Sequence, residues 1–228
     1  ADVILTIGGD GTILHEANLT LEYKKPILGV NLGRCGFLAT CEVDEMESKL
    51  SAVARGEYFL DNRMLLYVRV LGDDSWEGHA LNDVVMTKGR LQQAVDFSIY
   101  CDDILVEHYR GDGVIVATPT GSTAYSMSAG GPIVEPTARN LLLTPICPHS
   151  TRSSSYVLSP EHVITVEAPD ANRKFVYLSV DGGKAFSLKN NDQVRVSTSR
   201  YTTKLVRLSK KSFCEILDKK MGGEVTKA

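Results

Sequence analysis

The chain has 228 residues, of which 43% are hydrophobic and 23% charged, and its net charge is −3 at pH 7. A chain of this length and composition can bury one large core or two small ones. The slight negative charge argues against a general nucleic-acid binder, and no apolar run reaches the roughly 18 residues of a membrane span. Its five cysteines contain no Cys-x-x-Cys pair, which fits a reducing compartment, so we expect a cytoplasmic protein.

The first predicted element is a buried strand over residues 3–7, which ends in the turn Gly8-Gly9-Asp10-Gly11-Thr12. Ligands of open α/β sheets lie at the carboxyl ends of strands, and this spacing places Asp10 there. The glycines can expose backbone amides to phosphate oxygens, and the carboxylate can accept a proton. A glycine turn with an Asp helix cap has the same sequence, so this motif alone leaves both interpretations open.

The elements that follow predict two regions. A helix from about 12 to 22, a strand at 27–31 and a helix from about 44 to 55 are typical of βαβ units and a parallel sheet. From Met64 onward strand patterns dominate, and the chain ends in a strand from 204 and an amphipathic helix over 212–221. The predicted strands lie at 64–71, 77–86, 95–101, 103–109, 113–117, 155–158, 162–168, 174–180 and 193–198. We therefore expect an α/β, Rossmann-like N-terminal domain and an all-β, β-sandwich-like C-terminal domain.

Residues 111–131 form the most informative stretch. An apolar strand over 114–117 runs into a turn of Pro, Gly and small hydroxyl residues, followed by Ala- and Ser-rich sequence that resembles a helix. Side chains this small let a flat ligand lie against the backbone, and the hydroxyls and free amides can bind it. A capped helix with a small-residue packing face is the alternative, and the chemistry alone does not decide between the two.

Together, the two motifs resemble the NAD kinase family. The turn at residues 8–12 is shared with 6-phosphofructokinases and, in variant form, with diacylglycerol and sphingosine kinases, whereas 111–132 resembles NAD kinases alone. The similarity continues in order through residues 31–38, 81–85, 144–149 and 179–182. NAD kinases carry a strand and a helix before the first motif, so the chain resembles a member that lacks this unit, and we expect an exposed sheet edge or apolar face there.

The resemblance implies transfer of the γ-phosphoryl group of ATP, or of polyphosphate in some members, to the 2′-hydroxyl of the adenosine ribose of NAD. A carboxylate must orient this alcohol and take its proton, and Asp10 matches the family's position for that role. Mg²⁺ or another divalent cation would come with ATP, held largely by phosphates and water. The five histidines show no ligand spacing, so no metal site built by the protein is expected. The expected phosphate contacts are Gly8, Gly9, Gly11, Thr12 and Arg110.

The resemblance also assigns residues to NAD. Asn82 and Asp83 match an Asn-Glu pair that holds the adenosine, although the acid here is one methylene shorter. Asp112 matches an acid that meets the nicotinamide carboxamide bound by a neighbouring subunit, which implies a homodimer or homotetramer. From the same resemblance we expect a phosphate-donor domain made of residues 1–62, with 204–228 packing back on them. We expect the NAD-binding and oligomerisation domain to comprise residues 63–203. The remaining expected NAD contacts are Asp10, Gly11, Phe37, Thr123, Ala124, Tyr125, Ser128 and Asp181.

Some of these residues have ordinary structural interpretations as well. Phe37 follows a glycine and can be a core residue, Asp181 precedes a glycine and can belong to a hairpin turn, and Arg110 can simply cover the surface. Two other functions are also compatible with the sequence. A lipid or sugar kinase of the same superfamily would need an apolar cleft or a basic sugar-phosphate pocket, and the run at 118–125 argues against both. A non-catalytic module would bind NAD or NADP without turnover.

Overall fold

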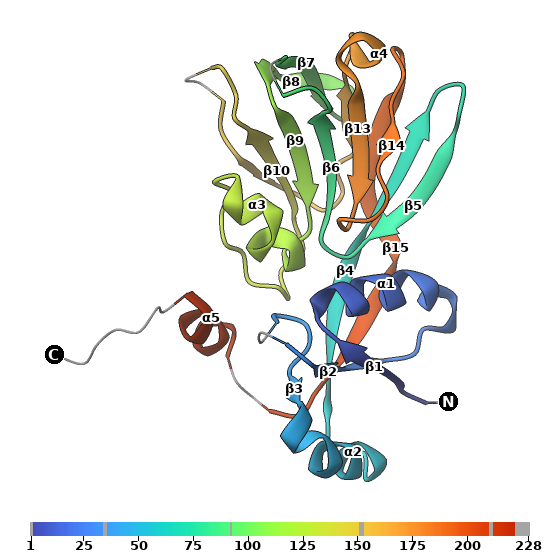
Figure 1. Ribbon diagram of the computed structural model, residues 1–228, viewed down its shortest axis with the longest axis vertical. Coiled ribbons are helices and arrows are strands. Elements are labelled where there is room, and N and C mark those ends of the chain that lie inside the picture. Colours follow the sequence, from blue (N-terminus) through green and yellow to red (C-terminus); the bar gives the residue numbers. More distant parts are fainter. Residues whose placement is uncertain (1, 34–35, 92, 151–152, 210–211, 222–228) are drawn as a thin grey trace, which may run out of the picture. The chain divides into compact units, whose positions relative to one another are not determined.

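A computed structural model describes residues 2–33, 36–91, 93–150, 153–209 and 212–221 (Figure 1). The chain divides into two compact units, Ala1–Arg63 with Thr202–Ala228, and Met64–Tyr201. Two long strands, β4 (Phe59–Leu71) and β15 (Gln193–Arg207), belong in part to each unit. None of the helices in the described part of the chain is long and apolar enough to cross a membrane.

The first unit contains the parallel sheet that the βαβ pattern predicts. β1 (Ile4–Gly8) pairs in parallel with β2 (Ile27–Asn31), and β2 pairs in parallel with β3 (Cys41–Glu42). Leu205 near the end of β15 also pairs in parallel with Ile27. Because β2 has neighbours on both sides, all five of its residues are buried. β1 lies at the edge, and its Leu5 and Ile7 are exposed.

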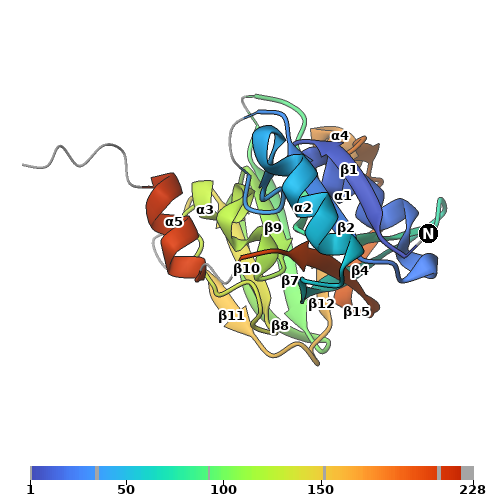
Figure 2. The ribbon, with the colours of Figure 1, turned by 90° about the horizontal axis from the view of Figure 1, so that it is seen from below.

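Two helices cover the opposite faces of β2. Ile13 of α1 (Asp10–Leu19) lies against Gly29, where a Cβ atom would overlap the isoleucine side chain. On the other face, α2 (Met46–Ala54) packs Leu50 and Val53 against the cluster of Leu28 and Val30. Figure 2 shows both helices with β1 and β2 from below. The alternation of residues along one strand thus gives the two-sided layering of an α/β unit.

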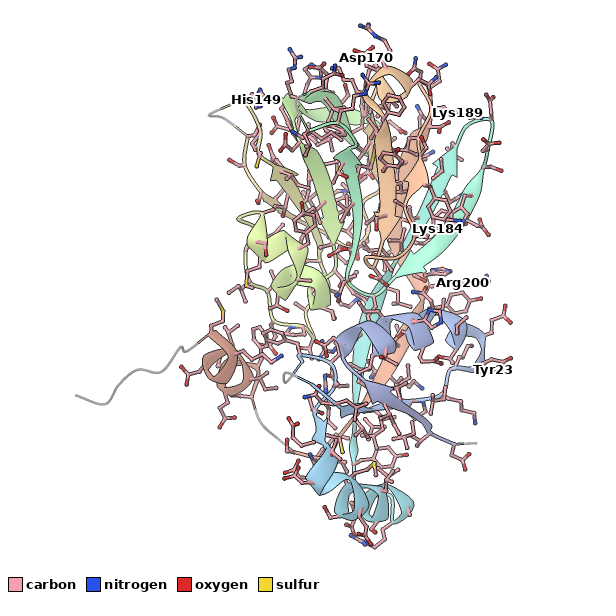
Figure 3. The ribbon with its side chains drawn as sticks, in the orientation of Figure 1. Tyr23, His149, Asp170, Lys184, Lys189 and Arg200 are labelled. Carbon is pink, nitrogen blue, oxygen red and sulfur yellow. The ribbon has the colours of Figure 1, made fainter. Side chains whose placement is uncertain are left out.

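Helix boundaries in this unit differ from the predicted ones by at most three residues. α1 begins at Asp10 and ends at Leu19. The Thr20 amide makes the last helical hydrogen bond, to the Glu16 carbonyl oxygen at 3.0 Å, and the Thr20 hydroxyl donates to the same oxygen at 2.6 Å. A 3₁₀ turn, η1 (Leu21–Tyr23), follows in place of the predicted last helical turn, and the Tyr23 side chain points outward (Figure 3). A second 3₁₀ turn, η2 (Val43–Glu45), precedes α2. α5 (Phe213–Met221) agrees with the predicted C-terminal helix.

The second unit contains two sets of antiparallel strands that share one core. Phe97 and Val166, from one set, and Val116 and Leu178, from the other, belong to the same buried cluster, which confirms the sandwich-like prediction. One set is a six-stranded sheet in the order β11 (Tyr156–Leu158), β10 (Leu141–Ile146), β9 (Gly113–Ala117), β6 (Asp83–Lys88), β13 (Val176–Val180), β14 (Phe186–Ser187). In the other, β12 (Ile164–Glu167) lies between β15 and β7 (Val95–Cys101), β7 pairs with β8 (Ile104–Gly111), and β4 pairs with β5 (Trp76–Ala80).

Two strand predictions were wrong, and one buried strand was not predicted. The predicted strand 77–86 is two strands, β5 and β6, because the chain passes from one sheet to the other at residues 81–82. The predicted strands at 193–198 and from 204 are one continuous strand, β15. The buried strand β10 was not predicted, since its apolar run is short and contains Pro145.

Short helices lie in two of the connections between strands. The helix-like stretch after β9 is a 3₁₀ turn, η3 (Thr120–Thr123), followed by one α-helical turn, α3 (Tyr125–Ser128). Near Asp170, which Figure 3 labels, α4 (Ala171–Lys174) follows the predicted strand 162–168, and the next strand, predicted from 174, begins at Val176. The Lys174 ammonium group pairs with the Asp96 carboxylate at 2.8 Å and fixes this helix to β7.

Candidate active site

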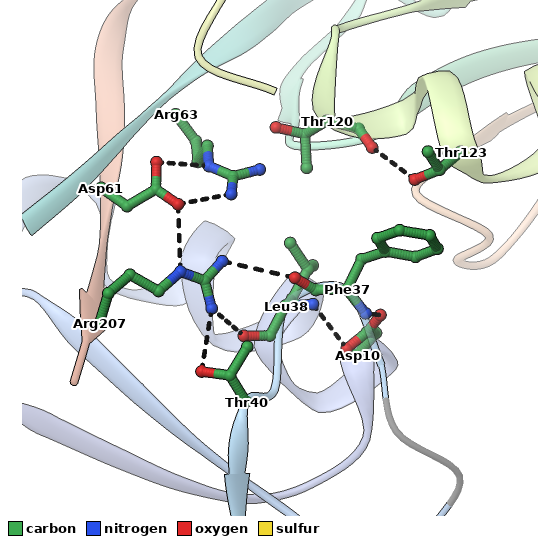
Figure 4. Close-up of polar contacts among 9 residues, drawn as sticks. All are labelled: Asp10, Phe37, Leu38, Thr40, Asp61, Arg63, Thr120, Thr123 and Arg207. Atoms are coloured by element: carbon green, nitrogen blue, oxygen red, sulfur yellow. Dashed lines mark hydrogen bonds and ion pairs between the residues drawn. The ribbon is translucent and has the colours of Figure 1, made fainter. Parts of the chain in front are cut away.

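The Asp10 carboxylate is the most strongly hydrogen-bonded group of the first motif (Figure 4). It lies at the first residue of α1, directly after β1. Its Oδ2 accepts the Phe37 amide at 2.7 Å, and its Oδ1 accepts the Leu38 and Ala39 amides at 3.0 Å each. No side chain caps α1, so the interpretation of Asp10 as the cap of its own helix is wrong. The carboxylate instead binds the loop that follows β2.

This loop approaches Asp10 very closely. A Cβ atom on Gly36 would overlap the Asp10 carboxylate, so only glycine allows the contact. The side chains of Leu38 and Ala39 are buried, whereas Phe37 is half-buried and its ring lies 3.8 Å from the Lys220 ammonium group of α5. Phe37 is therefore not the fully buried core residue that its sequence context also allowed.

The glycines around Asp10 differ in what requires them. A Cβ atom on Gly8 would overlap the Thr12 hydroxyl, so packing within the turn explains Gly8. A Cβ atom on Gly9 or Gly11 would meet nothing within 4 Å, and neither residue has a positive φ. Packing and backbone conformation therefore do not account for Gly9 and Gly11. Their exposed backbone leaves room for a ligand to approach closely.

In the second unit, three of the predicted motifs meet at one end of the six-stranded sheet. Asp83, at the start of β6, pairs with Ala117, at the end of β9, and Val84 pairs with Val180, at the end of β13. Because both pairings are antiparallel, the start of β6 lies beside the ends of its two neighbours. Asn82 and Asp83, the turn that begins at Thr118 and the turn at Asp181 are thereby brought together.

The Asp181 side chain organises this end of the sheet. Asp181 and Gly182 both have positive φ, 50° and 66°, as in a tight hairpin turn between β13 and β14. The Asp181 carboxylate accepts the amides of Leu81, Asn82 and Asp83 at 2.8, 2.7 and 3.1 Å. Asp181 is thus both a turn residue, as its sequence context allowed, and the anchor of the Asn82-Asp83 motif.

Asp83 has the most perturbed carboxyl group of the site. Its side chain is 5% exposed, and it accepts no hydrogen bond from the residues that the structure describes. Burial, with a smaller contribution from the Asp181 carboxylate, raises the pKa of Asp83 to about 7. A carboxyl group that titrates near neutrality, with open acceptor capacity, is a feature of ligand-binding sites.

The turn after β9 is tied to the same motif. The Thr118 hydroxyl donates to the Leu81 carbonyl oxygen at 2.6 Å, and a Cβ atom on Gly121 would overlap the Asn82 backbone. Ser122 and Ser126 are buried and their hydroxyls bind within the protein, to Val134 and Thr144. The four residues of this stretch that are predicted to contact NAD all keep accessible surface, as do their neighbours Met127, Ala129 and Gly130. These four are Thr123, Ala124, Tyr125 and Ser128.

The structure does not bring Asp112 or Arg110 to this cluster. Asp112 precedes β9 and Thr118 follows it, so about 20 Å separates them at roughly 3.3 Å per residue. The Asp112 carboxylate pairs with the Lys88 ammonium group at 2.6 Å, a partner that the sequence did not reveal. Arg110 is exposed on β8, which belongs to the other set of strands.

Two further groups of polar side chains could not be predicted from the sequence, because their members are far apart along the chain. One is the partly buried set Asp61, Arg63 and Arg207, which reaches the loop at Asp10 (Figure 4). The other is Cys101, Asp102 and His162, whose possible metal-ligating atoms lie within 4.8 Å of one another. Asp102 accepts hydrogen bonds from the Val163 amide and pairs with the His162 ring, so it also holds the β7–β8 turn in place.

Comparison with known proteins agrees with the motifs. The family described as ATP-NAD kinase N-terminal domain matches residues 1–58, and the ATP-NAD kinase C-terminal domain matches residues 81–208. The NAD kinase of Natranaerobius thermophilus is 40% identical over 225 residues, which cover 98% of this chain and 78% of that protein. The NAD kinase of Symbiobacterium thermophilum is 42% identical over 224 residues, 97% of this chain and 79% of that protein.

Solved structures agree as well. The yeast NADH kinase complexed with NADH superimposes with a TM-score of 0.91 at 31% identity, over 99% of this chain and 67% of the yeast chain. An NAD kinase from Archaeoglobus fulgidus in complex with ATP gives a TM-score of 0.76 at 31% identity, over 92% of this chain and 79% of the other. The chain belongs to the NAD kinase family, and its function is that of an NAD kinase.

The raised pKa of Asp83 predicts a pH-dependent stability. Because the pKa is about 7 in the folded protein and 3.8 ordinarily, folding takes up a proton between pH 4 and 7, and the free energy of unfolding falls as the pH rises through that window. Asp83→Asn removes this ionisation. Between pH 5 and pH 8 the variant should therefore lose less stability than the parent protein, by about 2 kcal/mol.

Thermal or urea unfolding at the two pH values measures this difference. Asp73→Asn, in the exposed β4–β5 turn, is the matched control and should leave the pH dependence unchanged. An Asp83→Asn variant with the same pH dependence as the parent protein would show that the Asp83 carboxyl titrates normally.

Proposed function

We propose that the Asp10 carboxylate orients the 2′-hydroxyl of the adenosine ribose of NAD and takes its proton as the γ-phosphoryl group of ATP is transferred. The bond between the ribose oxygen and the γ-phosphorus forms, the bond from that phosphorus to the β–γ bridging oxygen breaks, and ADP leaves. The observation that carries this proposal is the fixed geometry of Asp10, whose two oxygens accept three backbone amides. A fixed acceptor avoids the entropy cost of ordering it during the reaction.

The acceptor capacity of Asp10 supports the same role. An ionised carboxylate has about four acceptor positions, and the amides of Phe37, Leu38 and Ala39 fill three of them. One position remains for a donor such as a ribose hydroxyl. A secondary alcohol is a poor nucleophile at neutral pH, so a correctly placed proton acceptor assists its attack.

We further propose that the turn around Asp10 binds phosphate groups through Gly8, Gly9, Gly11 and Thr12. The open backbone at Gly9 and Gly11 supports this, because a phosphate can reach the amides without meeting a side chain. The turn also lies at the N-terminus of a ten-residue helix, where the helix dipole favours negative charge. Arg110 is exposed and carries a guanidinium group suited to a phosphate.

We propose NAD contacts in each of the two units, and the support for each set comes from that unit alone. In the first unit they are Asp10, Gly11 and Phe37. In the second unit, the buried carboxyl of Asp83 has no donor among the described residues, and a ribose hydroxyl would supply one. Tyr125 is 45% exposed, so its ring is available to stack on a base. The other proposed contacts of the second unit are Asn82, Asp112, Thr123, Ala124, Ser128 and Asp181.

The divalent cation, Mg²⁺ in this proposal, is bound mainly by ATP. One group of three or more metal-ligating side chains is found in the described part of the chain, and its member Cys101 offers a thiol, which Mg²⁺ does not favour. Hard oxygen ligands from the triphosphate and water suit Mg²⁺ better. The cation would neutralise the charge of the phosphates, while the residues around Asp10 hold the acceptor.

We also propose a cytoplasmic homodimer or homotetramer. β8 is the edge strand of its sheet, and Ile104, Leu105 and Val106 on it are all exposed. An apolar edge strand is suited to contact with another copy of the chain. Such an assembly would give Asp112 a route to a neighbour's nicotinamide. The free cysteines among the described residues fit the reducing cytoplasm.

Asp10→Asn should lower kcat by about 10²- to 10⁴-fold, because the amide cannot take the ribose proton. The dissociation constant for NAD should stay within about tenfold, since the interaction is made mainly in the transition state. A coupled assay of NADP formation, with calorimetry of NAD binding, separates the two effects. Near-normal turnover in this variant would remove Asp10 from the mechanism.

Tyr125→Ala should weaken NAD binding by about 1–3 kcal/mol through lost stacking or hydrogen bonding. Calorimetry measures the dissociation constant, with Tyr23→Ala, an exposed tyrosine of the first unit, as the matched control. If the two variants bind NAD equally well, Tyr125 is not part of the site.

Light scattering at micromolar concentration should show at least a dimer. Leu105→Asp should shift the protein toward the monomer, because the charge would have to be buried at the edge strand. Leu91→Asp, also at an exposed leucine but outside β8, is the control and should leave the assembly unchanged. A strictly monomeric parent protein that phosphorylates NAD would contradict the proposed shared site.

A further inference from the structure

Arg207, the last residue of β15, binds the loop at Asp10 from the opposite side. Its Nη1 donates to the Leu38 carbonyl oxygen at 2.8 Å and to the Thr40 hydroxyl at 3.2 Å. Its Nη2 donates to the Phe37 carbonyl oxygen at 3.4 Å. The Phe37 carbonyl shares its peptide group with the Leu38 amide (Figure 4), and the Leu38 carbonyl shares its peptide group with the Ala39 amide. Asp10 accepts both of these amides, so each peptide group is held at both ends, the amide by a carboxylate and the carbonyl by a guanidinium.

Arg207 is itself held in place by a second ion pair. Its Nε donates to Oδ2 of Asp61 at 3.1 Å, and the Arg63 guanidinium binds both oxygens of the same carboxylate. Burial favours the neutral form of Asp61, but the hydrogen bonds and charges of the two arginines hold its pKa below the usual value. The bidentate contact fixes the direction of the carboxylate and, through it, that of Arg207.

The charges of this partly buried group balance. Burial and, to a smaller extent, the Arg63 charge lower the pKa of Arg207 below its usual value, and the carboxylates of Asp61 and Asp10 oppose this shift. With Arg63, two positive and two negative groups lie together, so the removal of any one leaves a partly buried charge without its counterpart. The electrostatic balance therefore connects Asp10 with Arg207 in addition to the connection through the loop.

Burial of the loop does not require the guanidinium group. Leu38 and Ala39 are 3% and 1% exposed, so their side chains already fix the loop to the unit. Side-chain burial leaves the rotation of the peptide planes less well determined than their position, whereas hydrogen bonds at both ends determine it. Arg207 thus acts on the orientation of the amides that face Asp10.

We propose that Arg207, oriented by Asp61 and Arg63, is a positioning residue of the kinase. It holds the peptide group between Phe37 and Leu38 and the one between Leu38 and Ala39, so that the Leu38 and Ala39 amides keep the Asp10 carboxylate in one orientation toward the ribose hydroxyl. The inference rests on the proposed role of Asp10 as proton acceptor. Lysine cannot replace Arg207, because one ammonium group lacks the planar fork that reaches Asp61, Thr40 and two carbonyl oxygens together.

The test compares Arg207→Gln and Arg207→Lys with Arg55→Gln, which removes an exposed arginine that pairs with Glu57. Both Arg207 variants should lower kcat at least about tenfold while the dissociation constant for NAD changes less than about threefold. Hydrogen exchange of the Leu38 and Ala39 amides should become at least about tenfold faster. The Arg55 variant should change none of these quantities.

Normal kcat in Arg207→Gln, or a lowered kcat with unchanged exchange at these amides, would overturn the proposal. If the Arg207 variants do not fold, Thr40→Val removes one acceptor of the guanidinium at nearly constant volume. It should lower kcat and accelerate exchange to a smaller extent, and no change in either would also overturn the proposal.

The role of Asp10 as proton acceptor and the positioning role of Arg207 can be contradicted separately. Near-normal turnover in Asp10→Asn would contradict the role of Asp10, whatever the Arg207 variants do. Lowered kcat in Asp10→Asn together with normal kcat in Arg207→Gln would contradict the positioning role alone.

Discussion

The arrangement of the first unit depends on one interaction, the binding of three consecutive backbone amides by the Asp10 carboxylate. This contact joins the turn after β1 to the loop after β2, and it explains why Gly36 carries no side chain. It also fixes a carboxylate beside the open backbone of Gly9 and Gly11. One short turn thereby supplies both a proton acceptor and potential phosphate-binding amides. The carboxyl end of a parallel strand is where ligands of α/β sheets bind.

The second unit uses the same device. The Asp181 carboxylate also binds three consecutive amides, those of residues 81–83, and holds Asn82 and Asp83 at the end of the six-stranded sheet. In both units an aspartate fixes a segment through its backbone amides, so the anchoring hydrogen bonds do not use the side chains of that segment. Asp83 shows the consequence, because its buried carboxyl group retains open acceptor capacity and a pKa of about 7.

Much of the fold and of the candidate site could be predicted from the sequence, because these features depend on local sequence patterns. Alternation and glycine turns gave β2, β7 and β9 at their observed bounds, and the order of the motifs indicated the family. The passage from β5 to β6 could not be predicted, since the residues on either side look like one strand and only tertiary pairing assigns them to different sheets. The ion pair of Asp61 with Arg207 could not be predicted either, because no local pattern connects residues 146 positions apart.

The most direct test of this account is a double-mutant cycle of Asp10→Asn and Arg207→Gln, measured as the rate of NADP formation by concentrated enzyme over hours. If Arg207 acts through the Asp10 carboxylate, Arg207→Gln should slow the parent enzyme at least about tenfold but slow the Asp10→Asn variant less than about twofold. Equal losses in the two backgrounds would show that the residues act independently and would contradict the account.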